Sequence, residues 1–567
     1  MDTNSESDIQ DCYTVSDYIA DFITAKKVSG VFNLSGGMTA FMIDALHRRG
    51  DKEIINPKTE QAAGFAAEGA TRVAGMPAVA FATSGPGATN LITAIASCFF
   101  DSTPVIFITG QVNSNELRKN LLQRQNGFQE LDIVEMVEGI TKAAVQVRHA
   151  DELENLLDEF WEVACAGRPG PVLIDIPIDI QQERHERFSH KSNATREVKN
   201  LGLDYSAVIE AIQNSKRPLI LAGGGIRLDN SVELFRRFVK AWEIPVVTSL
   251  MGLDTLESES EFNLGLIGSY GHEYSNNSLY TCDLLIAIGT RIDVRQAPWD
   301  PVEFCKSKTI IRVDVDPNEL SGRINSNLQF QETVQEFLLG LLGEAIPNKG
   351  ISFRDLSKNL AKTISPIIGE ESPEGAVNPG GFLNKISEIC QSANGYIVDV
   401  GQHQMWAAQS LHIYPHQRFM TSGGLGSMGF ATPAAIGAAC AKSGRWIVIA
   451  GDGGFQMSTN ELETIRALRL DITIVVLNNK QHGMVAQFQR ENLGSRFIST
   501  REGYSAPDFQ KVSEAYGIKS YKISTNRDFT EMPREFLIGP GPTLIEVLIA
   551  QEEEALPKFN RKTYPLS

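Results

Sequence analysis

The sequence has few cysteines, and no two of them stand at a spacing that binds metal. There is no CxxC pair, and the seven thiols are scattered along 567 residues. An odd, scattered set of this kind predicts reduced thiols in a reducing compartment and argues against a zinc site. The positions are Cys12, Cys98, Cys165, Cys282, Cys305, Cys390 and Cys440.

Positive charge is also in short supply. Lysine and arginine number 52 against 69 acidic residues, which gives a formal net charge of −17. Such a surface repels a phosphate backbone, so we expect no nucleic-acid partner.

Signals for secretion or membrane insertion are lacking. The first residues, MDTNSESDIQD, have neither the basic nor the apolar region of a signal peptide. Two long uncharged runs, 73–100 and 419–441, are broken by glycine and proline, and therefore indicate buried segments of a globular fold. We expect a cytoplasmic protein without a membrane partner.

Short apolar strands alternate with helical stretches in three blocks. This pattern predicts an α/β fold of three doubly wound parallel sheets, each covered by helices on both faces. The expected domains are 1–182, 201–345 and 378–567, joined by polar linkers at 183–200 and 346–377. The first and third blocks share an architecture, which suggests two related domains flanking a third.

The third block contains the strongest local signal. The strand 446–450 ends in Gly451-Asp452-Gly453-Gly454, and the strand 472–477 ends in Asn478-Asn479. Ser458 precedes Glu461 by three residues, which predicts a capping box at the start of the connecting helix. A right-handed crossover makes the two strands parallel, so Asp452 and Asn479 should lie at the edge where such sheets bind ligands.

The residue types at this edge suit a phosphate held through a metal ion. One carboxylate and one amide oxygen are hard ligands of the kind that Mg²⁺ prefers. The glycines allow backbone N–H groups to approach a phosphate, and the following helix N-terminus favours an anion. The alternative is a plain turn with glycine for conformation and aspartate for an Asx bond. With Asn479 27 residues after Asp452, we favour a diphosphate site.

These motifs resemble thiamine-diphosphate (ThDP) enzymes, and specifically the acetolactate synthase (acetohydroxyacid synthase) group. The resemblance covers nearly the whole chain in order. Its blocks are EQAAGFAAEGATR (60–72), ATSGPGATNLITAIA (82–96), GRPGPVLIDIP (167–177), GQHQMWAAQ (401–409), TSGGLGSMGFATPAAIGAA (421–439) and the GDG…NN unit (451–479).

The resemblance implies a pyrimidine-binding first domain and a diphosphate-binding third domain. Glu60 matches the carboxylic acid that hydrogen-bonds to N1′ of the cofactor's pyrimidine, and Gly36, Gly37 and Gln129 match the other catalytic positions. Asp452 and Asn479 match the Mg²⁺ ligands, with the backbone carbonyl of Gln481 as a third. The other positions matched to ThDP are Gly401, Gln402, His403, Gly426, Met428, Gly453, Gly454 and Met484.

The middle domain resembles the FAD-binding domain of the same group. Its matching pieces include the AGGG turn at 222–225, GTRIDVR at 289–295 and VDVDPNE at 313–319. The turn is not GxGxxG, and several ThDP enzymes keep this domain without flavin. The resemblance assigns flavin contact to Arg168, Gly223, Gly224, Arg291, Arg295 and Asp314.

The chain departs from the family on the acceptor side. Met38 replaces a smaller residue after Gly36-Gly37, Ile178 stands where the family has lysine, and Phe488 stands where it has tryptophan. Phe128 and Gln129 survive, although the preceding loop differs. We expect Met38, Phe128 and Phe488 to contact substrate; Phe488 could instead simply repack a lid.

No histidine lies between positions 48 and 148, the region where simple 2-keto acid decarboxylases keep a proton-donating pair. The resemblance therefore implies decarboxylation of pyruvate followed by ligation of the hydroxyethyl (acetyl) unit to a second carbonyl, with ThDP, Mg²⁺ and FAD. One alternative is a larger acceptor such as a keto-sugar nucleotide. Pyruvate oxidase-like chemistry and an inactive regulatory homologue are the others. The resemblance also implies a homodimer or homotetramer with active sites between subunits, and allows a small regulatory subunit.

Overall fold

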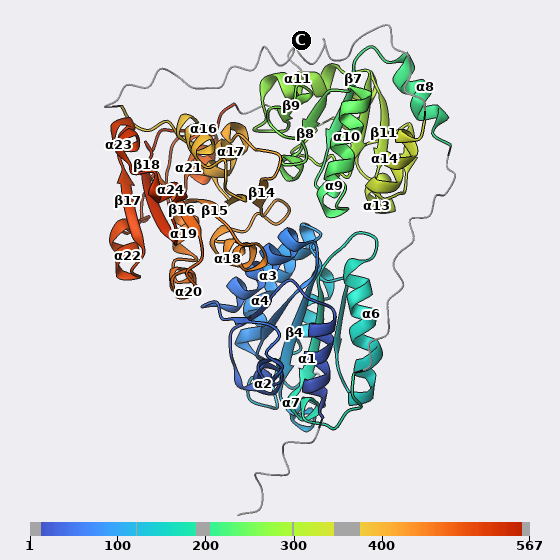
Figure 1. Ribbon diagram of the computed structural model, residues 1–567, viewed down its shortest axis with the longest axis vertical. Coiled ribbons are helices and arrows are strands. Elements are labelled where there is room, and N and C mark those ends of the chain that lie inside the picture. Colours follow the sequence, from blue (N-terminus) through green and yellow to red (C-terminus); the bar gives the residue numbers. More distant parts are fainter. Residues whose placement is uncertain (1–12, 121, 189–203, 298–299, 345–374, 558–567) are drawn as a thin grey trace, which may run out of the picture. The chain divides into compact units, whose positions relative to one another are not determined.

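A computed structural model describes residues 13–120, 122–188, 204–297, 300–344 and 375–557 (Figure 1). They form three six-stranded sheets, and every pairing between neighbouring strands is parallel. The expected α/β class is confirmed. The chain divides into two compact units, residues 1–195 with 424–443 and 458–470, and the remainder.

The first unit contains the sheet of order β2-β1-β3-β4-β6-β5. Its strands are β1 (Val31–Asn33), β2 (Ile54–Ile55), β3 (Ala78–Ala82), β4 (Val105–Gln111), β5 (Ala143–Gln146) and β6 (Val172–Pro177). Strands β3, β4 and β6 are buried throughout, because helices cover both faces of the sheet. The helical segments of this region are α1 (Val15–Ala25), η1 (Gly37–Thr39), α2 (Ala40–Arg49), α3 (Glu60–Ala74), α4 (Pro86–Phe100), η2 (Ser114–Glu116), α5 (Ile133–Val137), η3 (Glu138–Ile140), η4 (Ala150–Glu152), α6 (Leu153–Cys165) and α7 (Ile178–Gln181).

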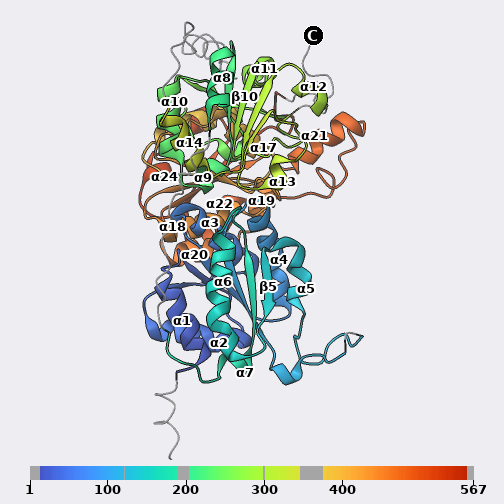
Figure 2. The same cartoon turned by 90° about the vertical axis from the view of Figure 1, so that its right-hand side faces the viewer.

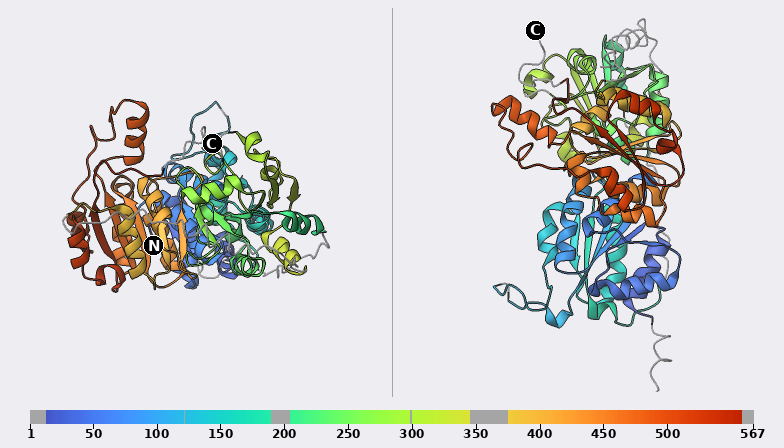
Figure 3. Two further views of the ribbon diagram at one scale, coloured as in Figure 1. Left: turned by 90° about the horizontal axis from the view of Figure 1, so that it is seen from above. Right: turned by 90° about the vertical axis from the view of Figure 1, so that its left-hand side faces the viewer.

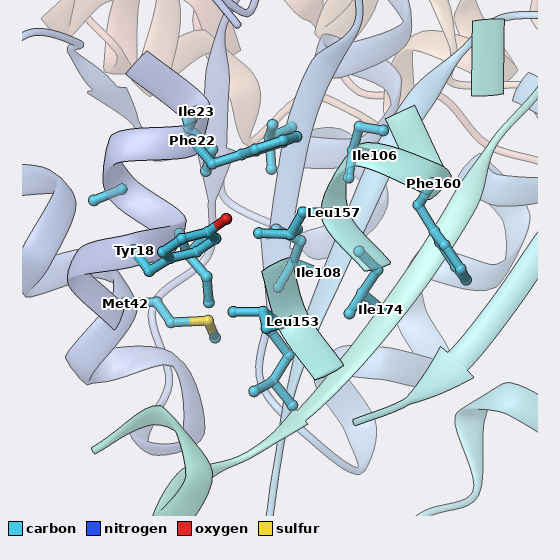
Figure 4. Close-up of a cluster of buried hydrophobic side chains, with 14 of the residues drawn as sticks. Tyr18, Phe22, Ile23, Met42, Ile106, Ile108, Leu153, Leu157, Phe160 and Ile174 are labelled. Atoms are coloured by element: carbon cyan, nitrogen blue, oxygen red, sulfur yellow. The ribbon is translucent and has the colours of Figure 1, made fainter. Parts of the chain in front are cut away.

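One face of this sheet is covered by α1, α2 and α6, and Figure 2 shows α6 running beside β5. Figure 4 shows the resulting core, in which Tyr18 and Phe22 from α1 and Leu157 from α6 face Ile106 and Ile108 of β4. Residue Phe107, between the last two, points to the opposite face, where it meets α3. Successive side chains of β4 thus pack on opposite faces of the sheet, in two separate layers.

Two further helices belong to the first unit, α18 (Ala431–Ala441) and α20 (Glu461–Ala467). Helix α18 packs directly on α3 through small residues. A Cβ at Gly69 would lie 2.8 Å from the carbonyl carbon of Ala434, and one at Gly437 would lie 2.6 Å from that of Ala66. Glycine at both positions therefore permits backbone-to-backbone contact between the helices.

The second unit contains the other two sheets. The central sheet has the order β12-β11-β10-β7-β8-β9, and its connections reverse direction between β7 and β10. Its strands are β7 (Pro218–Ala222), β8 (Val246–Thr248), β9 (Asn263–Leu266), β10 (Leu284–Ile288), β11 (Thr309–Val313) and β12 (Leu328–Phe330). Its helical segments are α8 (Ser206–Asn214), α9 (Gly225–Leu228), α10 (Val232–Trp242), η5 (Leu250–Gly252), α11 (Glu273–Thr281), α12 (Pro301–Cys305), α13 (Pro317–Leu320) and α14 (Val334–Leu342).

The third sheet has the order β14-β13-β15-β16-β18-β17, which repeats the topology of the first sheet strand for strand. The expected kinship of the first and third blocks is thereby confirmed. Its strands are β13 (Gly395–Val398), β14 (Arg418–Thr421), β15 (Trp446–Gly451), β16 (Ile472–Asn478), β17 (Lys519–Ile523) and β18 (Thr543–Leu548). The remaining helices are α16 (Pro379–Ile389), α17 (Gln402–Ser410), α19 (Asp452–Gln456), α21 (Gly483–Asn492), α22 (Phe509–Ala515), α23 (Asn526–Glu531) and α24 (Glu535–Ile538).

A buried carboxylate joins the central and third sheets within the second unit. Asp254 accepts hydrogen bonds from Arg418 Nε at 3.0 Å and Phe419 N at 3.1 Å, and Arg227 lies 3.3 Å away. Burial by itself raises the pKa of Asp254, but the two arginines and these hydrogen bonds outweigh it, so the pKa lies below its usual value. The carboxylate stays charged and paired.

The strands predicted at 446–450 and 472–477 are confirmed as β15 and β16, each one residue longer than predicted. The predicted capping box at Ser458 is wrong. Asn460 precedes α20, and Glu461 instead accepts a hydrogen bond from Lys58 N at 2.8 Å. The linkers predicted at 183–200 and 346–377 lie mostly outside the described residues. Within the described ranges, the cysteines are free and no helix has the length and apolar character needed to cross a membrane.

Candidate functional site

Glu60 lies at the carboxyl edge of the first sheet. It begins α3, and Thr59 caps the helix by accepting a hydrogen bond from Ala62 N at 3.1 Å. The neighbouring strands β1 and β3 lead into connections that run in opposite directions, so a crevice is expected at their carboxyl ends. The Glu60 side chain is buried at this crevice edge.

The two oxygens of Glu60 have different surroundings. Oε2 accepts a hydrogen bond from Asn90 Nδ2 at 3.0 Å. Oε1 faces Gly87, where a Cβ would lie 3.3 Å away. Oε1 is therefore the oxygen that this arrangement leaves for a ligand. Our sequence analysis missed Asn90; its signal was a polar residue one turn after Gly87 in the apolar helix α4.

The predicted glycine loop meets the same crevice through Thr83. Met38 N donates to Thr83 Oγ1 at 3.3 Å, and a Cβ at Gly36 would lie 2.6 Å from Thr83 Cγ2. The Met38 carbonyl accepts a hydrogen bond from buried Gln181 Nε2 at 2.8 Å. The loop that contains Gly36, Gly37 and Met38 is thus held on both sides.

Gln129 also reaches this edge, whereas Phe128 projects outward. Gln129 has a φ of +65°, and a Cβ at Gly85 would lie 2.9 Å from Gln129 Cβ. Gly85 directly precedes α4, whose second residue, Gly87, faces Glu60. The neighbouring Phe128 is 81% exposed.

Buried polar atoms without partners mark the ends of β1 and β3. Both amide atoms of Asn33 and the hydroxyl of Ser84 have no hydrogen-bond partner among the described residues. Buried groups of this kind lose free energy unless a ligand or water satisfies them. A polar heterocycle such as an aminopyrimidine fits this crevice.

The third sheet brings together Asp452 and Asn479, as the GDG…NN spacing predicted. Strands β15 and β16 are adjacent, with Gly451 opposite Leu477. The Asp452 carboxylate accepts hydrogen bonds from the backbone of Gly453 and Asn479, and from Tyr504 Oη at 2.6 Å. Burial raises the pKa of Asp452 to about 6, and these hydrogen bonds oppose the shift. Tyr504 is a second residue that our sequence analysis missed.

Asn479 is oriented by its neighbour on α17. Its Nδ2 donates to Gln402 Oε1 at 3.0 Å, which leaves Asn479 Oδ1 as the free end of the amide. A Cβ at Gly483 would lie 2.7 Å from Asn479 Nδ2, so a larger residue there would displace this amide pair. One carboxylate and one amide oxygen thus face the same edge. No cluster of three or more His, Cys, Asp or Glu that could hold a metal occurs in the described ranges. A cation here would accordingly need further oxygen ligands, as Mg²⁺ bound to a diphosphate has.

The turn after β13 completes this edge. His403 lies against Gly401 and Gly451, where Cβ atoms would come within 2.8 Å of its ring. Burial lowers the pKa of His403 to about 3, so the ring is neutral, and its Nε2 has no partner among the described residues. A Cβ at Gly454 would lie 3.1 Å from Asp399. The glycine backbone at this turn and the unpartnered ring nitrogen of neutral His403 fit a diphosphate.

The other residues predicted to bind ThDP or substrate in this region fall on α21 or near it. Gln481 is buried between Gln551 O and Arg501 Nε, each 2.6 Å away. Met484 Sδ accepts a hydrogen bond from Tyr270 Oη at 3.4 Å. Phe488, on the same helix, is 55% exposed.

Gly426 and Met428 belong to the first unit. Their segment is attached by Gly424 N, which donates to buried Asp101 Oδ1 at 2.6 Å, and Gly426 has a φ of +74°. Met428 is partly buried.

The predicted flavin residues gather only in part. Gly223 and Gly224 follow β7, and Arg291 follows the adjacent β10, at the point where the central sheet reverses direction. Arg291 pairs with Asp293 at 3.6 Å, and Asp314, after β11, accepts from Asp316 N at 3.0 Å. Arg295 is exposed.

Two arginines of this prediction need separate mention. Arg168 belongs to the first unit, where its Nε donates to Ser102 Oγ at 2.9 Å. Arg312, which our sequence analysis missed, is buried on β11. One of its terminal nitrogens donates to Thr290 O at 3.3 Å and the other has no partner within the described ranges.

Comparisons with known proteins identify the family of each domain. The chain matches the N-terminal TPP binding domain (residues 13–136), the central domain (205–341) and the C-terminal TPP binding domain (399–547) of thiamine pyrophosphate enzymes. It is 33% identical over 555 residues to an acetolactate synthase large subunit from Porphyra purpurea, covering 95% of this chain and 92% of the relative. The isozyme 2 large subunit from Escherichia coli K12 is 33% identical over 543 residues, covering 95% and 96% respectively. The large subunit from Lactococcus lactis is 33% identical over 537 residues, covering 93% and 91%.

Proposed function

Since the chain belongs to the acetolactate synthase group of thiamine-pyrophosphate-dependent enzymes, we propose that it decarboxylates pyruvate and joins the remaining two-carbon unit to a second carbonyl. Thiamine diphosphate, when bound, supplies the nucleophilic carbon and the electron sink that decarboxylation of a 2-keto acid requires. The protein supplies binding, orientation and proton placement. The observation that carries the proposal is the presence of Glu60 and Gln129 at one strand edge, without a histidine anywhere between positions 48 and 148.

Glu60 acts on the pyrimidine ring through Oε1. Asn90 occupies Oε2, so Oε1, on the Gly87 side, would be the oxygen that bonds to the ring. Gln129 and the glycine loop with Gly36, Gly37 and Met38 line the reacting side of the crevice. Because this segment carries no imidazole acid, a carbonyl acceptor competes well against protonation.

Asp452, Asn479 and the backbone carbonyl of Gln481 hold Mg²⁺ and, through it, the diphosphate. The support is chemical: hard oxygens on adjacent strand ends, with Gln402 turning the Asn479 amide so that its oxygen is free. His403, being neutral, offers a ring nitrogen without adding charge. Gly401, Gly453 and Gly454 keep the turn open, and Met428, Gly426 and Met484 contribute to cofactor binding.

We propose that the central domain binds FAD at the end of β7 and β10, through Gly223, Gly224, Arg291, Arg295 and Asp314, with Arg168 as a further contact. The buried, incompletely paired Arg312 supports an anionic ligand in this domain. The absorbance spectrum of the purified protein, before and after denaturation, tests for bound flavin.

The domains we propose are 1–182, 201–345 and 378–567. Each six-stranded sheet lies wholly within one range, which supports the division. Limited proteolysis should cut first between these ranges.

We propose a homodimer or homotetramer with active sites between subunits. Phe128 and Phe488, both proposed to contact substrate, are largely exposed in the single chain, and a second subunit would cover them. Relatives named as large subunits suggest a small regulatory subunit. Light scattering of the purified chain, alone and with candidate small subunits, measures both.

A second acceptor class is favoured by Met38, Ile178 and Phe488, which depart from the family on the acceptor side. Under this proposal the acetyl unit is added to a larger ketone or aldehyde.

The deciding experiment follows products by mass spectrometry. Purified protein receives ThDP, Mg²⁺, FAD and pyruvate, and CO₂, acetolactate, acetaldehyde and acetate are measured. Rapid acetolactate formation supports the synthase; CO₂ with little acetolactate calls for a screen of larger carbonyl acceptors. Acetate with bleaching of the flavin would indicate an oxidase, and absence of CO₂ would overturn the pyruvate proposal.

Two matched pairs of variants test the residues. We expect Glu60→Gln to lower turnover by about 100-fold or more, whereas exposed Glu138→Gln serves as its control. Asn479→Ala should weaken Mg²⁺-dependent ThDP binding, whereas exposed Asn56→Ala should not.

A further inference from the structure

The loop between β4 and α5 is anchored to the first sheet at both of its ends by one side chain, that of Gln111. Figures 2 and 3 show this loop projecting from the first unit. Gln111, the last residue of β4, holds both of its ends: Oε1 accepts from Val112 N at 3.0 Å, and Nε2 donates to Leu131 O at 2.7 Å. Nε2 also donates to buried Asp175 at 3.0 Å. The ends of the loop are therefore anchored to the sheet.

A second anchor lies inside the loop. Glu130 is only 8% exposed although the loop around it faces solvent. Its Oε1 accepts from Arg118 N at 2.8 Å, and its Oε2 accepts from Asn126 N at 2.6 Å. Its carbonyl accepts from Gln125 Nε2 at 3.1 Å. One carboxylate thus fixes the backbone at two points that precede it by 12 and 4 residues.

The residue next to this anchor has a strained backbone. Gln129 has a φ of +65°, in the left-handed region that side-chain-bearing residues seldom adopt. It lies against Gly85, which has a φ of +61°, and a Cβ on Gly85 would come within 3.0 Å of the Gln129 carbonyl oxygen. Such strain persists only where surrounding contacts hold it, and it gathers at sites of function.

We propose that Glu130 is a positioning residue that holds Gln129 in this left-handed conformation and so directs its side chain at the acceptor carbonyl. This inference rests on the function proposed above. The carboxylate suits the task because it offers acceptors on both oxygens, one for each backbone N–H. A glutamine would offer one acceptor and turn an N–H₂ group toward the other N–H.

The test is a double-mutant cycle between Glu130→Gln and Gln129→Ala, with Glu138→Gln as the matched control. Glu138 lies in the same region and is exposed. ThDP affinity, thermal midpoint, CO₂ release and ligated product are measured with pyruvate. Glu130→Gln should lower ligated product per CO₂ about tenfold, with ThDP affinity changed less than about twofold and the control equal to wild type.

The double-mutant cycle tests whether the effect of Glu130 depends on the Gln129 side chain. If Glu130 acts through Gln129, adding Glu130→Gln to Gln129→Ala should cost nothing further in product per CO₂. Additive losses of product per CO₂ in an active enzyme would overturn the inference. It would also be overturned if the lower product per CO₂ of Glu130→Gln were explained by weaker ThDP binding or by loss of folded protein. A wild-type protein that releases no CO₂ from pyruvate would overturn the proposed function and this assignment together.

Discussion

The contact between α3 and α18 predicts an unusual response to a helix-favouring substitution. Gly437 lies inside α18, where replacing glycine by alanine ordinarily stabilises a helix by about 1 kcal/mol. Here the new Cβ would lie 2.6 Å from the carbonyl carbon of Ala66 and 2.9 Å from Ala70 N. Carbon atoms in contact normally lie about 3.5–4.0 Å apart, and the Ala66 carbonyl oxygen would lie nearer still, so the helices must separate by at least about 1 Å.

Neither neighbour can rotate away, because both belong to the α3 backbone. Overpacking of this kind costs about 1–3 kcal/mol, and we expect the upper end of that range. After the propensity gain, Gly437→Ala should destabilise the first unit by about 2 kcal/mol, which lowers the unfolding midpoint by about 4–8 °C for a unit of this size.

Differential scanning calorimetry at one scan rate measures this shift. Gly139→Ala is the matched control, since a Cβ there meets nothing within 4 Å, and its midpoint should stay near that of wild type. If Gly437→Ala proved as stable as Gly139→Ala, the close approach of α3 and α18 would be refuted.

Three further outcomes follow from buried or paired polar groups. Asp254→Asn leaves two arginines without their counter-charge and should cost about 3–5 kcal/mol, seen as a lower thermal midpoint at neutral pH; an unchanged midpoint would contradict the buried bridge. Asp175 is fully buried among three neutral donors, and burial raises its pKa to about 6. Since the folded state binds this proton more tightly than the unfolded state, the contribution of Asp175 to stability falls as pH rises from about 4 to about 6. Asp175→Asn should therefore make the thermal midpoint depend less on pH between about 4 and about 6. A variant whose midpoints change with pH as those of wild type do would contradict the raised pKa of Asp175. Asn90→Ala removes a hydrogen bond to Glu60 and should weaken ThDP binding about tenfold with little change in midpoint; titration calorimetry would show unaltered affinity if Asn90 were dispensable.

Sequence alone reached the α/β class, the strands β15 and β16, and the placement of Asp452 near Asn479. These depend on short-range signals. Apolar runs bounded by glycine define buried strands, and a right-handed crossover places consecutive strand ends at one edge. A shared architecture of the first and third blocks was likewise expected, and their two sheets have the same strand topology.

Site roles such as that of Glu60 came from resemblance, and the tertiary structure added their surroundings. Asn90 is 30 residues from Glu60 in the chain and meets it only because α3 and α4 begin at one sheet edge. The capping box predicted at Ser458 does not form, because the Glu461 side chain instead accepts a hydrogen bond from the backbone N–H of Lys58, which is far away in sequence. The left-handed backbone of Gln129 and the close contact at Gly437 depend on neighbours that no local pattern identifies. Local sequence thus determined which helices and strands form and which polar residues follow the strand ends. Long-range packing decided that Asn90 takes Oε2 of Glu60 and leaves Oε1 facing Gly87.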